Sequence, residues 1–305
     1  MSMNTHGAAA RRPAVLVVGD VIDDLIVWPL EPVTRGSDTR SSIEPSLGGS
    51  GANQAVWLAA CGATVRFVGR VGRADRQRHE QAFAEAGVQA RLIGDDRRPT
   101  GTIVVVVDPD DGERTMYTDR GANLGLGVED LPDELLDGVG LLHVSGYSLF
   151  DASVRSAVLD LVARALRRDL PVAVDPASIA CLREIGPDRF LDWIGHVDLL
   201  FPNLDEGRLL TGEHDAEVAA TALLSHAEVV ALKLGEEGAI VARRDRNPCR
   251  VPAVDSEVVD TTGSGDASCG AFLAGWLAGE GDAQLLEAAV AAGARAAGVA
   301  GARPR

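Results

Sequence analysis

The chain has 305 residues, of which 46% are apolar and 24% charged, a balance typical of a globular protein with a substantial core. Its formal charge of −16 argues against nucleic acid or an anionic membrane as a partner, because either would require a basic face. No apolar run approaches the roughly 18 residues of a membrane-spanning helix. Four widely spaced cysteines without a C-x-x-C pair favour reduced thiols and a cytoplasmic location.

Residues 1–13 are mostly small and polar, with no apolar stretch, so we expect a disordered tail and not a signal peptide. From residue 14 onward, short apolar runs alternate with segments of helical period. The expected strands are Ala14–Val18, Val65–Val68, Leu141–Val144, Val172–Val174, Leu199–Phe201 and Val229–Leu232. The expected helices include Ala52–Ala60, Ser153–Arg167 and Ala216–Leu224. This alternation predicts an α/β fold with a mainly parallel sheet, helices on both faces, and ligands at the carboxyl ends of the strands.

Two segments interrupt this alternation. Residues 27–45, approximately, contain three prolines and a glycine with no helical period, and residues 100–120 contain two strand-like runs around Pro109-Asp110-Asp111-Gly112. We expect these segments to pair into a small antiparallel β lid on a single domain of residues 14–305. Such a lid could close over a substrate and exclude water from a reaction.

The stretch Asp260-Thr261-Thr262-Gly263-Ser264-Gly265-Asp266 precedes a helical run, Ala267–Ala278. Glycines and a serine at a helix start expose backbone N–H groups, which together with the helix dipole form an anion site. The carboxylate of Asp266 would disfavour simple phosphate binding. It suits a base that takes a proton from a hydroxyl attacking a phosphoryl group. The alternative is an ordinary helix cap with turn glycines.

Two other nucleotide-binding motifs are missing from the sequence. The one lysine, Lys233, is followed by Leu234, so there is no Walker A loop. No G-x-G-x-x-G follows the first strand, which disfavours a dinucleotide-dependent dehydrogenase.

A second glycine cluster, Gly48-Gly49-Ser50-Gly51, is followed by Asn53. Glycines let a ligand approach the backbone, and an Asn amide can donate and accept, which suits a sugar diol; a turn capped by Ser50 is the alternative. Asp24, shortly after the first strand, could accept from two adjacent hydroxyls or be an ordinary surface acid.

Two further clusters follow later strands. Asn203 and Glu206 lie about one helical turn apart, which suits hydrated magnesium near a phosphate chain, or a helix cap. The turn from Lys233 through Gly235 to Gly238 could line a nucleotide or be only a hairpin.

In this order along the chain, Gly48-Gly49-Ser50-Gly51-Ala52-Asn53, Asn203-x-x-Glu206 and the stretch Asp260–Asp266 resemble the ribokinase (PfkB) family of carbohydrate kinases. The resemblance extends from about Val15 to Val299. It implies a three-layer α/β/α fold with a β lid, and transfer of the γ-phosphate of ATP to a sugar hydroxymethyl group with Mg²⁺.

The resemblance also implies roles for individual residues. Asp266 looks like the base, and the N–H groups of Gly263, Ser264 and Gly265 look like the anion hole. Asp24, Gly49 and Asn53 look like sugar contacts. Gly48, Arg120 and Asn123 are further candidate substrate contacts, where Arg120 could reach a carboxylate or phosphate or form a salt bridge in the lid. The implied nucleotide and magnesium contacts are Asn203, Glu206, Lys233, Gly235 and Gly238. Asp260 and Thr262 match positions that hold a monovalent cation, such as K⁺, in some members.

Departures from the family pattern bear on the acceptor. Ribokinases proper carry an Asn where Ile22 stands, a Lys where Ser50 stands, and an acid where Ser145-Gly146-Tyr147 stands. These differences argue against ribose and leave another sugar or a sugar acid as the acceptor. A nucleoside kinase of the same family and a non-catalytic sensor are the alternatives, and the 4% aromatic content disfavours a stacked base. A homodimer through the lid is expected from family likeness alone.

Overall fold

The computed structural model describes residues 13–108 and 114–304. Apart from Pro13, the expected tail at 1–13 lies outside the described residues, and so does the whole of the expected turn at residues 109–112.

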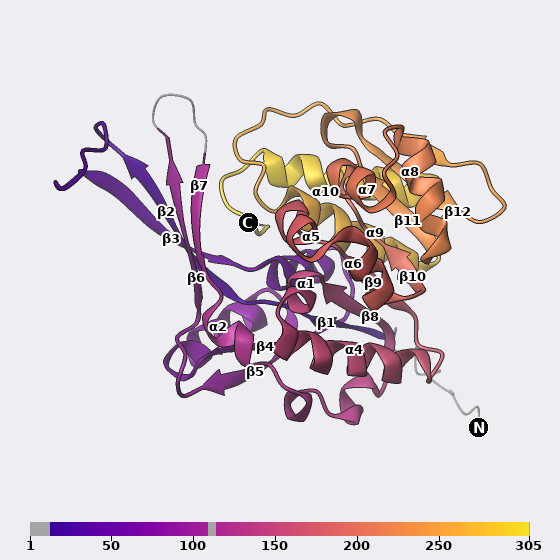
Figure 1. Cartoon of the computed structure of the whole chain (residues 1–305), viewed down its shortest axis with the longest axis horizontal. Helices are drawn as coiled ribbons and strands as arrows, with labels where there is room; N and C mark the ends of the chain where they lie inside the picture. Colours follow the sequence, from indigo (N-terminus) through magenta and orange to yellow (C-terminus); the bar gives the residue numbers. More distant parts are fainter. Residues whose placement is uncertain (1–12, 109–113, 305) are drawn as a thin grey trace, which may run out of the picture.

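A nine-stranded sheet forms the centre of the molecule (Figure 1). Its strand order is β13-β12-β11-β10-β9-β8-β1-β4-β5; it is parallel from β11 to β5 and antiparallel at β11–β12 and β12–β13. The strands are β1 Ala14–Val18, β4 Val65–Gly72, β5 Val88–Asp95, β8 Val139–Ser145, β9 Val172–Asp175, β10 Val197–Leu200, β11 Ala227–Lys233, β12 Ala239–Arg243 and β13 Cys249–Val251. Each apolar run that was expected as a strand is one, because a parallel strand buried on both faces has few polar positions.

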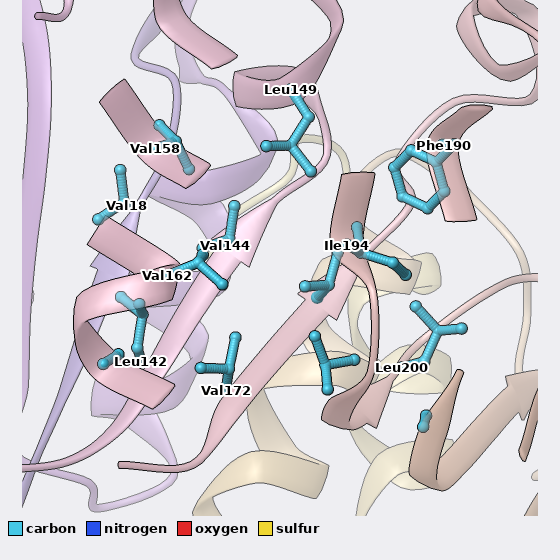
Figure 2. Close-up of a cluster of buried hydrophobic side chains, with 14 of the residues drawn as sticks. Val18, Leu142, Val144, Leu149, Val158, Val162, Val172, Phe190, Ile194 and Leu200 are labelled. Carbon is cyan, nitrogen blue, oxygen red and sulfur yellow. The ribbon is translucent and has the colours of Figure 1, made fainter. Parts of the chain in front are cut away.

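Helices cover both faces of this sheet, which confirms the three-layer prediction. One face packs against α1 (Ser50–Ala60), α2 (Arg76–Glu85), α9 (Ser264–Ala278) and α10 (Asp282–Ala297). The other face packs against α3 (Tyr147–Phe150), α4 (Ala152–Leu166), α5 (Ile179–Ile185), α6 (Pro187–Ile194), α7 (Leu204–Thr211) and α8 (Ala216–Ala222). Figure 2 shows the second core, in which strand residues such as Val144 meet Val162 of α4 and Ile194 of α6.

A second sheet of four strands projects from the body (Figure 1). It consists of β2 (Ile22–Pro29), β3 (Ser41–Gly48), β6 (Gly101–Val107) and β7 (Arg114–Asp119), in the order β3-β2-β6-β7. The expected smaller antiparallel sheet is therefore confirmed, although its two antiparallel pairs are joined by a parallel pair, β2–β6. Because β2 begins soon after β1 ends, the lid is attached directly at the carboxyl edge of the central sheet.

Close backbone contacts at two glycines determine where α1 and α9 begin. A Cβ on Gly51 would lie 2.5 Å from the Cα of Gly19, so the first turn of α1 lies directly against the end of β1. Gly263 has a φ of 76°, and a Cβ there would lie 2.5 Å from the carbonyl oxygen of Ala302. The C-terminal segment, residues 299–304, therefore packs against the start of α9.

Within the described part of the chain, no helix is both long and apolar enough to cross a bilayer.

Candidate active site

The carboxyl ends of the central strands and the inner face of the lid enclose one cavity of about 1030 Å³. The predicted site residues that line it are Asp24, Gly49, Asn53, Arg120, Asn203, Glu206, Lys233, Gly235, Gly238, Thr262, Gly263, Ser264, Gly265 and Asp266. They come from both sheets and from the starts of α1, α7 and α9. The fold thus brings together residues that lie more than 200 positions apart in the sequence.

The start of α9 presents backbone N–H donors to this cavity. Gly263 adopts a left-handed conformation with a φ of 76°, which turns the chain sharply into the helix. Within the described chain, the N–H groups of Gly263 and Gly265 have no hydrogen-bond acceptor, while that of Ser264 donates to Thr261 O over 3.2 Å. Such donors at a helix N-terminus favour a bound anion, so this geometry is consistent with the predicted anion site.

Asp266 lies in the first turn of α9, beside these donors. Its Oδ1 accepts from Ser50 Oγ at 2.7 Å and its Oδ2 from Asn53 Nδ2 at 3.2 Å. Burial raises the pKa of Asp266 to about 7, and the neighbouring Asp175 carboxylate adds to that rise, while the two hydrogen bonds oppose it. A carboxyl group with a pKa near neutrality can accept and return a proton at working pH.

Lys233 lies next to the anion site at the end of β11. Its Nζ donates to Asp175 Oδ2 at 2.9 Å and lies 3.7 Å from the position that a Cβ on Gly265 would take. Burial opposes the charge on Lys233, but the carboxylates of Asp175 and Glu206 outweigh it and raise the pKa. The ammonium therefore stays charged and adds a cation to the anion site.

A buried chain of hydrogen bonds, through Gln54 and His143, also holds Asp175 in place. Gln54 Nε2 donates to Asp175 Oδ2 at 3.1 Å, and His143 Nε2 lies 2.8 Å from Gln54 Oε1. Burial lowers the pKa of His143 to about 4, so its neutral ring donates Nε2–H to Gln54. This fixes the Gln54 amide and leaves its N–H₂ group for Asp175.

Asn203 and Glu206 form the start of α7. Asn203 Oδ1 accepts from the Glu206 backbone N–H, and Glu206 Oε2 accepts from the Asn203 N–H, each at 2.9 Å. This is the capping box that was the alternative to a magnesium site, although both residues also line the cavity. Burial raises the pKa of Glu206 to about 7, an effect that Lys233 opposes and Asp175 reinforces.

No three His, Cys, Asp or Glu side chains gather into a metal cage among residues 13–108 and 114–304. Carboxylates on the cavity wall, such as Glu206 and Asp175, fit a magnesium ion, which keeps several waters and takes its remaining ligands from phosphate oxygens. The donor set therefore fits magnesium that arrives with a nucleotide.

The lid end of the cavity carries the predicted acceptor contacts. Burial, together with the Asp20 carboxylate, raises the pKa of Asp24 to about 6. Arg120 Nη1 lies 3.1 Å from Asp20 Oδ2, and its guanidinium stacks 4.7 Å from the ring centroid of Tyr147. The salt bridge that was weighed for Arg120 is therefore present, and it fixes the guanidinium at the cavity wall.

Three predicted residues lie outside the lining, as far as the described residues show: Gly48, Asn123 and Asp260. A Cβ on Gly48 would lie 2.0 Å from Asp24 Oδ2, so this glycine leaves room for the Asp24 carboxylate. Asn123 is buried and pairs with the backbone N–H and C=O of Val21, which fixes the passage from β1 to β2.

The carboxylate of Asp260 is surrounded by donors. It accepts from the N–H groups of Thr262 and Gly301 and lies 2.8 Å from Arg114 Nη1 of β7. Arg114 also donates to Thr262 Oγ1. Burial opposes the charge, but these contacts lower the pKa of Asp260. An arginine of the lid thus binds the two residues that resemble a monovalent-cation site.

Sequence reasoning did not include several residues of the site: Asp20, Ser50, Asp175, Tyr147 and Arg303. Asp20 and Asp175 stand at the carboxyl ends of expected strands, a position that could have identified them. Nothing in the sequence places Ser50 against Asp266, or Arg303 against Asn53.

Comparison with known proteins identifies the family of the chain. The model of the "pfkB family carbohydrate kinase" matches residues 12–304. The chain belongs to the pfkB family of carbohydrate kinases. It is therefore a phosphotransferase with an alcohol group as acceptor. Within that class it is a sugar or nucleoside kinase.

Relatives in the family differ in substrate. The chain is 29% identical to a ribokinase of Arabidopsis thaliana, covering 97% of this chain and 79% of that protein. It is 25% identical to a 5-dehydro-2-deoxygluconokinase of Listeria monocytogenes, covering 98% and 92%.

Solved structures show the same fold. An adenosine kinase from Sinorhizobium meliloti superposes with a TM-score of 0.85 at 26% identity, over 96% of both chains. Arabidopsis thaliana ribokinase, complexed with ribose and ATP, gives 0.79 at 26% identity, over 95% of this chain and 94% of that one. An Escherichia coli protein in complex with ATP and Mg²⁺ gives 0.83 at 22% identity over 95% and 94%, which shows the fold alone.

Proposed function

We propose that this kinase transfers the γ-phosphate of ATP to a hydroxymethyl group of a sugar or sugar acid, with Asp266 as the base and residues 263–265 as the anion hole. One observation carries the proposal. The Asp266 carboxylate stands at the N-terminus of α9, in a cavity under the lid, beside the N–H groups of Gly263 and Gly265, which have no acceptor in the described part of the chain.

The nucleotide is proposed to lie along the part of the cavity formed by β10, β11 and α9. Lys233, Gly235 and Gly238 line it there, together with Asn203 and Glu206. The γ-phosphate would point at the start of α9, where backbone donors and the Lys233 ammonium stabilise the charge that spreads over the phosphoryl oxygens.

The acceptor is proposed to lie under the lid, between Asp24, Gly49 and Arg120, with its hydroxyl toward Asp266. The proton of this hydroxyl passes to Asp266 while its oxygen bonds to the γ-phosphorus. The bond from the γ-phosphorus to the β–γ bridging oxygen breaks, and ADP leaves with that electron pair. Asp266 then releases its proton to solvent, which its pKa of about 7 permits at neutral pH.

Magnesium belongs to the proposal as the ion that arrives with ATP. Glu206, with Asn203 and Asp175 nearby on the cavity wall, would hold it through water molecules. When bound, the ion neutralises phosphate charge. Binding of ATP with and without EDTA tests this role in the absence of any acceptor.

The proposal also places a monovalent cation at Asp260 and Thr262. Arg114 lies 2.8 Å from Asp260 Oδ1, so K⁺ could bind this carboxylate only if the guanidinium moves away. Rates in potassium and tetramethylammonium salts test the point. A higher rate in K⁺ supports a cation site. Equal rates indicate that Arg114 alone provides the positive charge beside Asp260.

A nucleoside is the second candidate acceptor. The lid contributes the apolar side chains of Ile103 and Met116 to the cavity wall, and an apolar slot suits a base. The adenosine kinase that shares 26% identity supports the same reading.

An acceptor panel with Mg–ATP tests the function: D-ribose, D-fructose, D-gluconate, 5-dehydro-2-deoxygluconate, fructose 6-phosphate and adenosine, with ADP release as the readout. Fast turnover of one of the first five compounds supports the sugar or sugar-acid assignment. Turnover of adenosine alone transfers the assignment to a nucleoside kinase. Silence from all six, with ATP still bound, favours the sensor.

The proposal also includes a cytoplasmic location and a homodimer through the lid. Large apolar side chains that do not line the cavity are exposed on the lid, among them Ile43 at 59% and Tyr117 at 62%, and such exposure is typical of an interface. Sedimentation velocity tests the dimer, and a monomer at micromolar concentration would contradict it.

A further inference from the structure

The C-terminal segment, residues 299–304, packs against the loop that precedes α9. Trp57 Nε1 of α1 donates to Ala302 O at 3.0 Å, and the Gly301 N–H donates to Asp260 Oδ2 at 3.1 Å. Ala302 is buried against Gly263. These contacts hold the segment between α1 and α9, and none of them involves the side chain of Arg303.

The Arg303 side chain extends from this segment toward the residues around the base. Its Nε donates to Asn53 Oδ1 at 3.0 Å and its Nη2 to Gly48 O at 3.2 Å. The guanidinium also lies 5.5 Å from the ring centroid of Phe83. Both hydrogen-bond acceptors are neutral. Within the described chain, no carboxylate lies at hydrogen-bond distance from the Arg303 guanidinium.

This arrangement fixes the orientation of the Asn53 amide. A guanidinium carries donors only, so the Asn53 atom that faces Arg303 is the oxygen. The amide nitrogen must then face the other way, where its N–H donates to Asp266 Oδ2 at 3.2 Å. A hydrogen bond to an ionised carboxylate is stronger than one to the neutral acid, so the chain Arg303–Asn53–Asp266 favours the ionised form of Asp266, which is ready to accept a proton.

We propose that Arg303 is a positioning residue of the phosphoryl transfer, which fixes the amide of Asn53 so that Nδ2 holds the ionised carboxylate of Asp266 in place. This inference rests on the proposed role of Asp266 as the base. Nothing in it requires Arg303 to touch ATP or the acceptor.

The positive charge of Arg303, like its hydrogen bond to Asn53, favours the ionised form of Asp266. The carboxylates of Asp23, Asp24 and Asp266 lie close enough to act on the guanidinium, although burial lowers the pKa of Arg303 to about 10. Asp266 also faces Asp175 and Lys233. Those two groups are unchanged by a substitution at Arg303, so a change in the titration of Asp266 can be assigned to Arg303.

The test compares Arg303→Met, Arg303→Lys and a control, Arg155→Met. Met keeps the length and the packing on Phe83, and Lys keeps the charge. Arg155 also donates to two backbone carbonyls and stacks on an aromatic ring, that of Trp193 at 3.8 Å. It does not line the cavity, so its substitution reports the general cost of losing such an arginine.

Turnover is measured as ADP release with Mg–ATP and the fastest acceptor of the panel above. For Arg303→Met we expect kcat to fall about 10- to 100-fold, the range found for hydrogen-bond partners that orient metal ligands, with the KM for ATP nearly unchanged. The acid limb of kcat should move to higher pH, because the ionised form of Asp266 is less favoured. Arg303→Lys should recover part of the rate, and Arg155→Met should keep it.

A measurement without any acceptor covers the case in which turnover is too slow to follow. Asp266→Asn is introduced into the wild type and into Arg303→Met, and the unfolding temperature at pH 8 is recorded. If Arg303 favours the ionised carboxylate, Asp266→Asn should raise the unfolding temperature more in the Arg303→Met background. Equal shifts in both backgrounds would overturn the proposal.

The outcomes separate the two hypotheses. Wild-type turnover in Asp266→Asn refutes the base, and with it the proposed function. An inactive Asp266→Asn together with an unchanged kcat and pH profile in Arg303→Met refutes only the role of Arg303. A lower unfolding temperature of Arg303→Met with normal kcat also refutes it, because that result indicates a merely structural residue.

Discussion

Gly263 and Gly265 lie two positions apart, yet the structure predicts opposite effects for a methyl group added at each. Gly263 has a φ of 76°, and its added Cβ would lie 2.5 Å from the carbonyl oxygen of Ala302. Gly265 lies inside the first turn of α9 without a positive φ, and the nearest atom to its added Cβ is Lys233 Nζ at 3.7 Å. A methyl group at position 263 therefore strains the fold, whereas one at position 265 makes only an ordinary van der Waals contact.

The expected magnitudes follow from these distances. Gly265→Ala should be neutral or stabilising by up to about 1 kcal/mol, because alanine is the better helix former. Its methyl group would still stand where a phosphoryl oxygen approaches the Gly265 N–H, and a misplacement of about 1 Å costs on the order of 10²-fold in rate. Gly263→Ala should lose about 1–2 kcal/mol to the left-handed backbone, and more to the collision with Ala302.

Thermal unfolding and the initial rate of ADP release measure the two effects separately. Gly279→Ala is the matched control, since Gly279 ends the same helix with a φ of 77° and nothing lies within 4 Å of its added Cβ. It should lose stability through backbone strain alone and keep full activity. A Gly265→Ala variant with wild-type turnover, or one that unfolds as early as Gly263→Ala, would refute this account of the anion loop.

Three further predictions concern charged groups of the cavity. Since burial raises the pKa of Asp266 to about 7, kcat should rise between pH 6 and 8, and a profile that stays flat down to pH 5 would contradict a buried base. Asp24→Asn should raise the KM for the acceptor roughly 10-fold or more and leave the KM for ATP unchanged; a change in the KM for ATP alone would contradict an acceptor contact. Lys233→Met should destabilise the protein by about 3–5 kcal/mol, because Asp175 and Glu206 lose their cation. Since the pKa of Glu206 is raised to about 7, this loss should shrink below pH 6 as that carboxyl protonates, and urea unfolding at pH 8 and pH 5.5 would measure it.

The fold could be predicted largely because its central strands are buried on both faces. A run such as Ala14–Val18 is fully buried and contains only apolar residues, so its boundaries are visible in the sequence. The edge strand β5 mixes buried and exposed positions, including Gln89 and Arg91, and was not predicted. The helix α2 was missed for a similar reason, because only His79 and Phe83 of its residues are buried.

The anion loop could be predicted because its parts are adjacent in the sequence. The glycines and Asp266 lie within one turn of a helix start, so local rules are sufficient. Pairings between distant side chains follow no local rule. Ser50 lies 216 positions from Asp266, and Arg303 lies 250 positions from Asn53; only the packing of α1, α9 and the C-terminal segment brings them together.

The substitution Asp266→Asn tests the central claim most directly. As a base, Asp266 should contribute about 10²–10⁴-fold to turnover, so kcat should fall by that factor while the Kd for ATP stays the same. The variant should also unfold at a higher temperature than the wild type at pH 8. An acid whose pKa is raised by folding disfavours the folded state above its unfolded pKa, and asparagine lacks this penalty; at pH 4 the difference should largely disappear. Loss of turnover with intact ATP binding and greater stability at pH 8 is the predicted result. Wild-type turnover would show that Asp266 is not the base.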